Sequence, residues 1–419
     1  MTEKEPGTIS VRWITEGEND NFNIRYHLNG RESDEKNIGN SSIIRQNITG
    51  QTLCSAEISG LYPGCRIFGR LLKEGNFCQP FSFQIPDKKS GFEFVVLSDL
   101  HSSPENQENY ESLSCNSAGY DSASQVLKTI TDCINSDDDP SFVVITGDLV
   151  NDGYLLHEWK EFFVRASPLL NKTVLYTTPG NHEKNSTFYY DFFGYPQFYS
   201  TQTGGCGLVF LDSNDNAAVT FPLQKELITN LTGNTDSQKE SQLNFIFFHH
   251  PPYSSDERHP GGWKNIRKAW GEAIENTVNP VVFSGHVHAY ERFETRNATY
   301  IVSGTGGGEL YSLGTYPDEN NLPKRSIENE YGYMKVRVPA GGNYAEISFI
   351  SPAISDNRDI ITESATGEIT QLPGVRIRPK VLDYSVAGNR YGNNQFMEKI
   401  MRVTENYPFL FFFRRMNGC

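Results

Sequence analysis

Side chains that commonly bind metals or move protons stand directly after short apolar runs at five places in the chain. Of the nine histidines, only His27 and His157 lie outside these places or the loop after one of them. Carboxylate, amide oxygen and imidazole together suit zinc, manganese or iron, whereas an all-oxygen set would suit calcium or magnesium. The set therefore predicts a site for transition-metal ions. The residues of this set, at the ends of the five apolar runs, are Asp99, His101, Asp148, Asn181, His182, Glu183, His249, His250, His286 and His288.

The last of these places is the segment Gly-His-Val-His at residues 285–288, which follows an apolar run. Alternate residues of an extended strand point the same way, so His286 and His288 are expected to face one common point. Two imidazoles that meet either share a metal ion or compete for a proton, and this motif alone leaves both open. Asn181 and His182 are adjacent and should point differently, which favours Asn181 as a ligand and His182 as a residue beside the ligands.

The charge balance bears on the substrate. The formal net charge is −14, and an acidic chain is a poor binder of nucleic-acid backbones. Two divalent ions would bring four positive charges, of which Asp99 and Asp148 would cancel two. The positive charge that remains would attract a small phosphorylated substrate. Such an ion pair would also lower the pKa of a bound water toward about 7, giving a metal-bound hydroxide as nucleophile.

The elements that must position these side chains form a β-strand and α-helix pattern between residues 92 and 350. Short apolar runs typical of buried strands alternate with helical patterns, which predicts an α/β domain. In an open α/β sheet, ligands bind beyond the carboxyl ends of the strands, where the candidate residues stand. The strand-like runs are 92–97, 141–146, 173–178, 207–211, 244–248 and 280–283, and helical faces are expected around 126–134, 155–163 and 266–274.

The rest of the chain has other patterns. Residues 8–86 read as short alternating strands separated by turns, which predicts a small β-sandwich, and 86–91 is a plausible linker. Residues 351–419 have no clear assignment. Their apolar end, 408–413, is too short to cross a membrane, so it either packs against the body or anchors a partner. No transmembrane segment is expected, and the first residues are polar and do not resemble a signal peptide.

The seven cysteines are scattered and form no Cys-x-x-Cys pair, which argues against a zinc site built from thiolates. Cys54, Cys65 and Cys78 lie close enough in sequence to form a disulfide if the protein is exported. Free thiols throughout are the alternative.

The five motifs in this order resemble the calcineurin-like metallophosphoesterase superfamily. They are Asp-x-His, Gly-Asp, Gly-Asn-His-Glu, a histidine after an apolar strand, and Gly-His-x-His, within about residues 92–350. The segments HHPPYSS and GHVHAYER are similar to the purple acid phosphatase branch, and ISGLYPGCRIFGRL is similar to its fibronectin type III-like domain. The resemblance implies an α/β (α+β) fold, with a four-layer α/β/β/α sandwich at 91–350, a small all-β sandwich at 1–90, and an extension at 351–419.

The resemblance also implies roles for individual residues. His182 would contact the phosphate or protonate the leaving oxygen, with Glu183 orienting it. His259 would be a further substrate histidine, although Arg258 beside it is an alternative phosphate ligand. Asp148 would bridge two metal ions. One ion would be held by Asp99, His101, Asp148 and His288, and the other by Asp148, Asn181, His249 and His286.

Two positions depart from the purple branch. Asn151 stands where that branch has a tyrosine, and His101 stands where it has a glycine. A purple colour is therefore not expected, and the two ions could be Mn, Zn or Fe. The function implied is phosphate ester hydrolysis, with monoesters favoured. A phosphodiesterase acting on cyclic nucleotides or other diesters is the alternative, and a non-catalytic binding module is a third. The purple branch favours an exported protein, periplasmic or extracellular.

Overall fold

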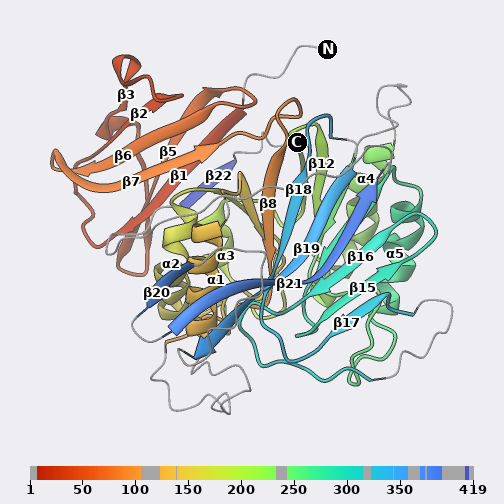
Figure 1. Cartoon of the computed structure of the whole chain (residues 1–419). Helices are drawn as coiled ribbons and strands as arrows, with labels where there is room; N and C mark the ends of the chain where they lie inside the picture. Colours follow the sequence, from red (N-terminus) through yellow and green to blue (C-terminus); the bar gives the residue numbers. More distant parts are fainter. Residues whose placement is uncertain are drawn as a thin grey trace.

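The computed structural model describes residues 7–104, 123–137, 139–232, 243–314, 322–342, 344–356, 369–372, 375–388 and 411–414. Within these residues, strands form three sheets, and two of the sheets stack face to face at the centre of the molecule (Figure 1). Both central sheets contain parallel strands that correspond to the apolar runs of the sequence. These are β8 (Phe92–Leu97), β9 (Phe142–Ile145) and β10 (Val174–Thr177) in one sheet, and β12 (Cys206–Phe210), β13 (Asn244–Phe247), β14 (Pro280–Ser284) and β16 (Thr299–Ser303) in the other.

Antiparallel strands extend both central sheets. In the first sheet β18 pairs with β8, and β19 pairs with β18. In the second sheet, β11 pairs antiparallel with β12, and β15 pairs antiparallel with β16. β17 pairs with β15 and forms an edge of the sheet. Their bounds are β11 (Tyr199–Thr203), β15 (Tyr290–Glu294), β17 (Arg325–Ile327), β18 (Tyr333–Val338) and β19 (Tyr344–Asp356).

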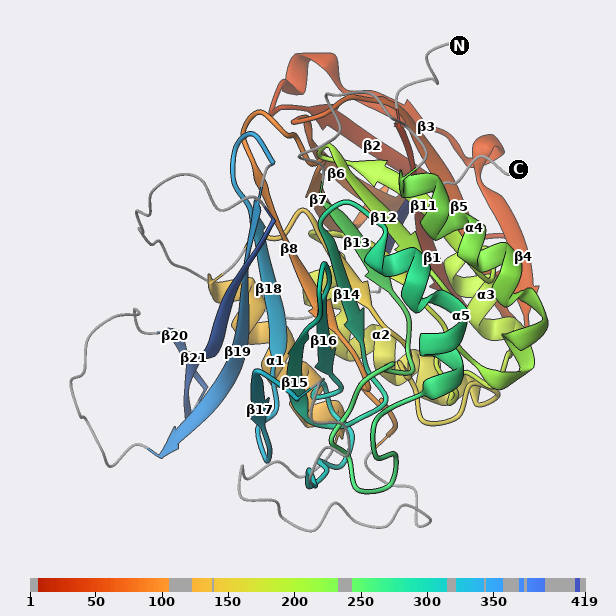
Figure 2. The same cartoon turned by 90° about the vertical axis from the view of Figure 1, so that its right-hand side faces the viewer.

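Helices cover the outer faces of the two central sheets, as the two views together show (Figure 1 and Figure 2). The first sheet is covered by α1 (Ala123–Asp137), α2 (Leu156–Leu170) and α3 (Thr187–Phe193), and the second by α4 (Phe221–Thr232) and α5 (Lys264–Glu275). The helical faces expected from the sequence are buried, as at Ile130, Trp159 and Trp270. The four-layer α/β/β/α arrangement is therefore confirmed.

Aromatic side chains fill the space between the two central sheets. The rings of Phe94 on β8 and Phe245 on β13 meet edge to face, 5.0 Å apart. Tyr176 on β10 stacks on Phe210 of β12 at 5.3 Å. Edge-to-face and offset contacts of this kind stabilise a core beyond the area they bury. This packing fixes one sheet against the other and thereby fixes the relative positions of their strand ends.

The first strands form a β-sandwich. The ring of Trp13 on β1 lies 5.3 Å from that of Phe22 on β2, across the space between its two sheets. One layer contains β1 (Gly7–Thr15), β4 (Ile44–Ile48) and β5 (Gln51–Leu61), which continue the first central sheet beyond β10. The other layer is the third sheet, with β2 (Phe22–Leu28), β3 (Lys36–Ile38), β6 (Arg66–Lys73) and β7 (Asn76–Gln84). The sandwich also contains two short 3-10 helices, η1 (Glu32–Asp34) and η2 (Asn40–Ser42). A third one described, η3 (Asp215–Thr220), directly precedes α4.

The described parts of the last 69 residues, which the sequence left unassigned, are strands. Residue 350, the expected end of the catalytic domain, lies inside β19, and β19 pairs with β21 (Val375–Gly388), which in turn pairs with β20 (Ile369–Leu372). The short β22 (Phe411–Arg414) pairs antiparallel with β1 and parallel with β10. For residues 411–413 of the apolar end, which are the described ones, the structure thus shows pairing with the body.

Among the described cysteines, Cys54, Cys65, Cys78 and Cys206 are free thiols. The disulfide considered among the first three is therefore absent, and the alternative of free thiols holds for them. Cys115 and Cys419 lie outside the described residues. No helix in the described part of the chain is long and apolar enough to span a membrane.

Candidate metal centre

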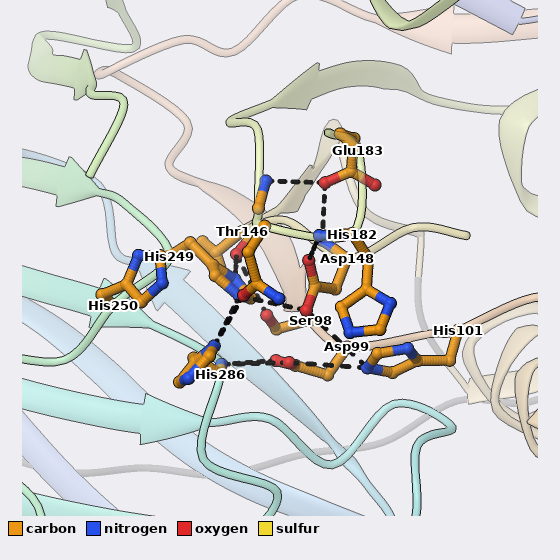
Figure 3. Close-up of polar contacts among 12 residues, drawn as sticks. Ser98, Asp99, His101, Thr146, Asp148, His182, Glu183, His249, His250 and His286 are labelled. Carbon is orange, nitrogen blue, oxygen red and sulfur yellow. Dashed lines mark hydrogen bonds and ion pairs between the residues drawn. The ribbon is translucent and has the colours of Figure 1, made fainter. Parts of the chain in front are cut away.

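The candidate residues meet where strand ends of the two central sheets approach each other. Asp99, Asp148 and Asn181 follow β8, β9 and β10, whereas His249 and His286 follow β13 and β14 of the second sheet. Figure 3 shows Asp99, Asp148, His249 and His286 turned toward one another. The five strands thus deliver their ligands to one place, but from two facing sheets rather than from the edge of one.

The backbone turns sharply at these positions. Asp99, His101, Asp148 and His286 have φ values of 56°, 43°, 52° and 66°. Positive φ is uncommon for residues other than glycine, and where it persists the surrounding structure must enforce it. These residues lie in turns beyond the strand ends, so strand alternation does not describe their directions. The expectation that His286 and His288 face one common point is wrong, because each belongs to a different cluster.

The first cluster joins the ends of β8 and β14. His288 Nε2 lies 3.2 Å from Asp99 Oδ1 and 3.2 Å from His101 Nε2. His101 Nε2 lies 3.8 Å from Asp148 Oδ2. Asp99 also accepts hydrogen bonds from the backbone N–H of His286, at 3.0 Å and 2.8 Å from its two oxygens. These are the four residues implied for one metal ion, and the structure brings them together.

The second cluster contains the other implied set. His249 Nε2 lies 3.1 Å from Asp148 Oδ2, 3.0 Å from Asn181 Oδ1 and 3.1 Å from His286 Nδ1. Asn181 Oδ1 lies 2.8 Å from His286 Nδ1. Asp148 therefore contacts both clusters, as expected of a bridging carboxylate. Ligand atoms of Asp99, Asp148 and His249 all lie within 4.8 Å of one another.

Backbone carbonyls determine which nitrogen of two rings faces the clusters. His249 Nδ1 donates to the Thr146 carbonyl at 2.9 Å, and His288 Nδ1 donates to the Glu309 carbonyl at 2.6 Å. A neutral ring that donates from Nδ1 presents a lone pair at Nε2. Both Nε2 atoms therefore point an acceptor at carboxylate oxygens. Acceptors that converge in a buried site need a cation or a proton between them, and the residue types here fit a pair of metal ions.

The electrostatics of the site favour the protonation states in which most of these residues bind metal, namely neutral imidazole and ionised carboxylate. Burial and the neighbouring His288 lower the pKa of His101 to about 3, and burial with the neighbouring His249 lowers that of His286 to about 2. Although burial opposes ionisation of Asp148, His249 holds its pKa well below its ordinary value. Burial likewise opposes charge on His249, but Asp148 and Asp99 raise its pKa to about 10. Metal ions bind neutral imidazole, so binding would displace that proton.

Comparison with known proteins assigns the central part of the chain. Residues 92–290, which carry all ten candidate residues, match the family model described as calcineurin-like phosphoesterase. This part of the chain therefore resembles a calcineurin-like phosphoesterase domain. Purple acid phosphatase 22 of Arabidopsis thaliana is 26% identical over 287 residues, which cover 62% of this chain and 61% of that protein. Purple acid phosphatase 18 of the same plant is 26% identical over 222 residues, covering 46% and 50%.

Solved structures share the fold. Purple acid phosphatase PPD1 from yellow lupin (Lupinus luteus) seeds aligns with a TM-score of 0.63 and 14% identity, covering 82% of this chain and 70% of that one. PhoD aligns with a TM-score of 0.58 and 10% identity, covering 91% and 88%. The resemblance to the purple acid phosphatase branch is thus confirmed, although the chain spans only about three fifths or less of the length of the curated relatives named above.

Glu183 occupies a different place in the phosphoesterase domain from the one implied by the resemblance. Its carboxylate accepts from the backbone N–H groups of Asp148, Leu149 and Gly180, at 2.9 Å, 2.8 Å and 2.6 Å. Burial and the nearby Asp148 raise its pKa to about 8. Its described contacts therefore hold the turn that carries Asp148, rather than the ring of His182.

His182 is oriented by the backbone instead. Its Nδ1 donates to the Asn151 carbonyl at 2.6 Å, and its backbone N–H donates to Asp148 Oδ1 at 2.8 Å. Its ring lies 4.5 Å from that of His101 (Figure 3). The position where the purple branch has a tyrosine thus contributes its main-chain oxygen. The ring stands beside the first cluster, as the sequence predicted.

His250 lies beside the second cluster, and one of its ring nitrogens is within 4.8 Å of ligand atoms of His249 and His286. Its Nδ1 lies 2.9 Å from Ser213 Oγ, and its backbone N–H donates to the same oxygen at 2.9 Å. Its ring packs 4.5 Å from the ring of His286. These contacts suit a residue that supports the second cluster.

His259 lies at the rim of the second cluster. Its Nδ1 is 2.9 Å from Asp256 Oδ2, and its ring is 5.5 Å from that of His286. Sequence analysis missed two aromatic neighbours of the site. Trp263 stacks on His259 at 4.3 Å, and Tyr311 stacks on His288 at 4.2 Å. No local pattern marks these rings. Trp263 stands in the glycine-containing loop after the His249 motif, whereas Tyr311 stands in the glycine-containing loop after β16.

Proposed function

We propose that the protein is a binuclear metal-dependent hydrolase of phosphate esters and that monoesters are its preferred substrates. The observation that carries the proposal is the double contact of Asp148. One of its oxygens lies 3.8 Å from His101 Nε2 and 3.1 Å from His249 Nε2, so a single carboxylate serves both clusters of acceptor atoms. The match of residues 92–290 to the phosphoesterase family supports the same conclusion.

The ligand sets follow the two clusters. When bound, a pair of divalent Mn, Zn or Fe ions would supply positive charge to the phosphate and lower the pKa of a water toward about 7, so that hydroxide is available near neutral pH. The first ion is assigned to Asp99, His101, Asp148 and His288, and the second to Asp148, Asn181, His249 and His286.

Residues beside the clusters handle the proton and the substrate. Because His182 donates from Nδ1 to the Asn151 carbonyl, its Nε2 is the atom that can contact the phosphate or pass a proton to the leaving oxygen. His259 is held at Nδ1 by Asp256, which leaves Nε2 for the substrate. Glu183 acts through Asp148 by holding its backbone. Charge on the metal pair, positioning and proton transfer would together accelerate ester cleavage.

The decisive experiment is reconstitution of the full chain. Metal-stripped protein is loaded separately with Mn, Zn and Fe, the bound ions are counted, and p-nitrophenyl phosphate is compared with bis-p-nitrophenyl phosphate. We expect about two ions per chain and faster hydrolysis of the monoester. His286→Ala should lose one ion and nearly all turnover, whereas His157→Gln on α2 should retain both.

Each other result has a defined meaning. Faster cleavage of the diester would replace the monoesterase by a phosphodiesterase. Two bound ions without hydrolysis of either ester would favour a binding module in which the β-sandwich recognises the ligand. Wild-type turnover in His286→Ala would refute the assignment of the second cluster.

We also propose that the chain divides into a β-sandwich at 1–90, a catalytic domain at 91–350 and an extension after it. Limited proteolysis with mass spectrometry would test the first boundary, since a linker at 86–91 should be cut before the sheets. Export is the proposed location, and cell fractionation that places the protein entirely in the cytosol would refute it.

A further inference from the structure

The positively charged side chain of Arg258 is separated from the first cluster by the ring of Tyr311. The ring of Tyr311 stacks on His288 with 4.2 Å between centroids and 18° between planes. The guanidinium carbon of Arg258 lies 3.2 Å from the centre of the Tyr311 ring. Two groups this close to one ring occupy its opposite faces, so Tyr311 separates Arg258 from His288. The backbone N–H of Tyr311 donates to the His288 carbonyl at 2.9 Å, which ties this stack to the metal-binding turn.

The loop that carries Arg258 is held from several sides. The Asp256 side chain is buried, and its two oxygens hold neighbouring groups, with Oδ1 3.6 Å from Arg258 Nε and Oδ2 2.9 Å from His259 Nδ1. Ser255 donates its backbone N–H to the carboxylate of Glu291, which is buried on β15, at 2.9 Å. Its carbonyl accepts from Gly314 N–H at 2.6 Å. The cation is therefore placed by the fold before any ligand arrives.

Arg258 remains open to a ligand in this position. Its side chain is 53% exposed, while the aromatic face beneath it fixes the plane of the guanidinium. A guanidinium carries five N–H donors in a rigid fork that matches phosphate and carboxylate oxygens, and stacking on an aromatic ring leaves the edge of that fork available. The chain as a whole has a net charge of −14, so its overall electrostatic field repels anions. The exposed positive charge of Arg258 beside the site would attract an anion locally.

We infer that Arg258 binds a second phosphate of the substrate, beyond the phosphate that is cleaved, and so selects for esters that carry two phosphoryl groups. The inference rests on the proposed phosphatase function. The clusters are placed to engage the cleaved phosphate, whereas Arg258 lies beyond Tyr311, a full ring further out. A group bound there is remote from the reacting bond, so its binding energy should appear mainly in KM.

The test compares fructose 6-phosphate with fructose 1,6-bisphosphate, in which every phosphate is a monoester and which differ by one phosphate, using the full metal-loaded chain and initial rates of phosphate release. Arg258→Gln should lower kcat/KM for the bisphosphate by about 10-fold or more, mainly through KM, and change that for the monophosphate by less than about threefold, since hydrogen bonds to charged groups contribute at least that much. Arg258→Lys, which keeps the charge without the fork, should fall between. Arg296→Gln, at an exposed position two residues beyond the end of β15, is the matched control and should affect neither substrate.

The two proposals fail in different ways. If wild-type protein hydrolyses neither sugar phosphate nor p-nitrophenyl phosphate, the phosphatase function itself is wrong. If it hydrolyses them and Arg258→Gln lowers kcat/KM equally for the monophosphate and the bisphosphate, or for neither, the inference about the second phosphate is overturned while the phosphatase stands. Tyr311→Phe, which keeps the stacking ring, should preserve the wild-type preference. Loss of the bisphosphate preference in this variant would also contradict the inference, because it would assign the effect to the hydroxyl.

Discussion

The Nε2 atoms of His101 and His288 lie 3.2 Å apart, although 187 positions separate the two residues in the chain. His288 donates from Nδ1 to the Glu309 carbonyl, so its Nε2 carries a lone pair. Burial lowers the pKa of His101 to about 3, so that ring is neutral near pH 7. Asp99 Oδ1, 3.2 Å from His288 Nε2, adds a further acceptor to the same point. This arrangement is stable only with a cation or a proton among the acceptors.

Metal removal should therefore destabilise the protein. An ion present at 100 times its dissociation constant stabilises the native state by about 2.7 kcal/mol. We expect a chelator to lower Tm by several degrees and metal to restore it. Asp148→Asn should abolish this response, while Asp215→Asn, an exposed change, should leave it intact. Thermal melts with and without chelator make the comparison. An unchanged wild-type Tm after complete metal removal would contradict the prediction.

Replacement of His182 should separate chemistry from metal binding. His182→Ala removes the ring beside His101 but no member of the implied ligand sets. Loss of a positioned acid or base typically costs 10²- to 10⁴-fold, so we expect about that decrease in kcat. Elemental analysis should still find two ions. A variant that has lost an ion would show that His182 is itself a ligand.

Glu183→Gln tests the support of the Asp148 turn. An amide in this place keeps one acceptor oxygen but turns an N–H₂ toward backbone N–H donors. We expect a destabilisation of about 1–3 kcal/mol and metal binding weakened by about 10- to 100-fold. Denaturant unfolding and metal titration measure the two effects. Glu226→Gln on α4 serves as the exposed control. Equal behaviour of the two variants would exclude the supporting role.

Gly285 should tolerate no side chain. A Cβ at this position would collide with Ser98 and with the carboxylate of Asp99, which binds the His286 backbone. Gly285→Ala should therefore displace Asp99 and reduce bound metal and turnover by at least about 10-fold, since site groups act only when well placed. Gly271→Ala on α5 meets only Arg267 at 3.6 Å and should stabilise the helix by about 0.5–1 kcal/mol. Normal activity of Gly285→Ala would contradict the site geometry.

The thiols should differ in reactivity. Burial raises the pKa of Cys54 to about 11 and that of Cys206 to about 12, whereas Cys78 is only half-buried. A raised thiol pKa means less thiolate at a given pH, and the thiolate is the form that reacts. At pH 8, iodoacetamide should label Cys78 well before Cys54 and Cys206, which should react only after unfolding. Peptide mass spectrometry would reveal a disulfide at any of them and thereby refute the free-thiol assignment.

Local sequence was sufficient for the main elements. Runs such as 92–97 and 280–283 match β8 and β14 because buried strands are short, apolar and rich in branched residues. The amphipathic helices α1, α2 and α5 were equally readable, whereas α4 was missed. In contrast, α3 has only seven residues, too few to display a helical period, and β15 follows a metal-binding motif without a separating turn signal, so both were missed.

The residue types alone indicated metal chemistry. The order of the motifs along the chain gave the family resemblance, and that resemblance implied the two ligand sets. Which imidazole faces which cluster was decided by tertiary structure. Positive φ at His286 turns its ring toward His249 and Asn181, and no spacing rule in the sequence carries that turn. The same holds for Glu183, whose partners are backbone amides of other loops.

The chain by itself thus determined the elements and the inventory of donors, because periodicity and residue chemistry depend on near neighbours. Only the tertiary structure decided the two-sheet origin of the site, the shared contact of Asp148, and the stack of His288, Tyr311 and Arg258. These features depend on contacts between segments far apart in the chain, and such contacts are set by how the sheets pair and pack against each other.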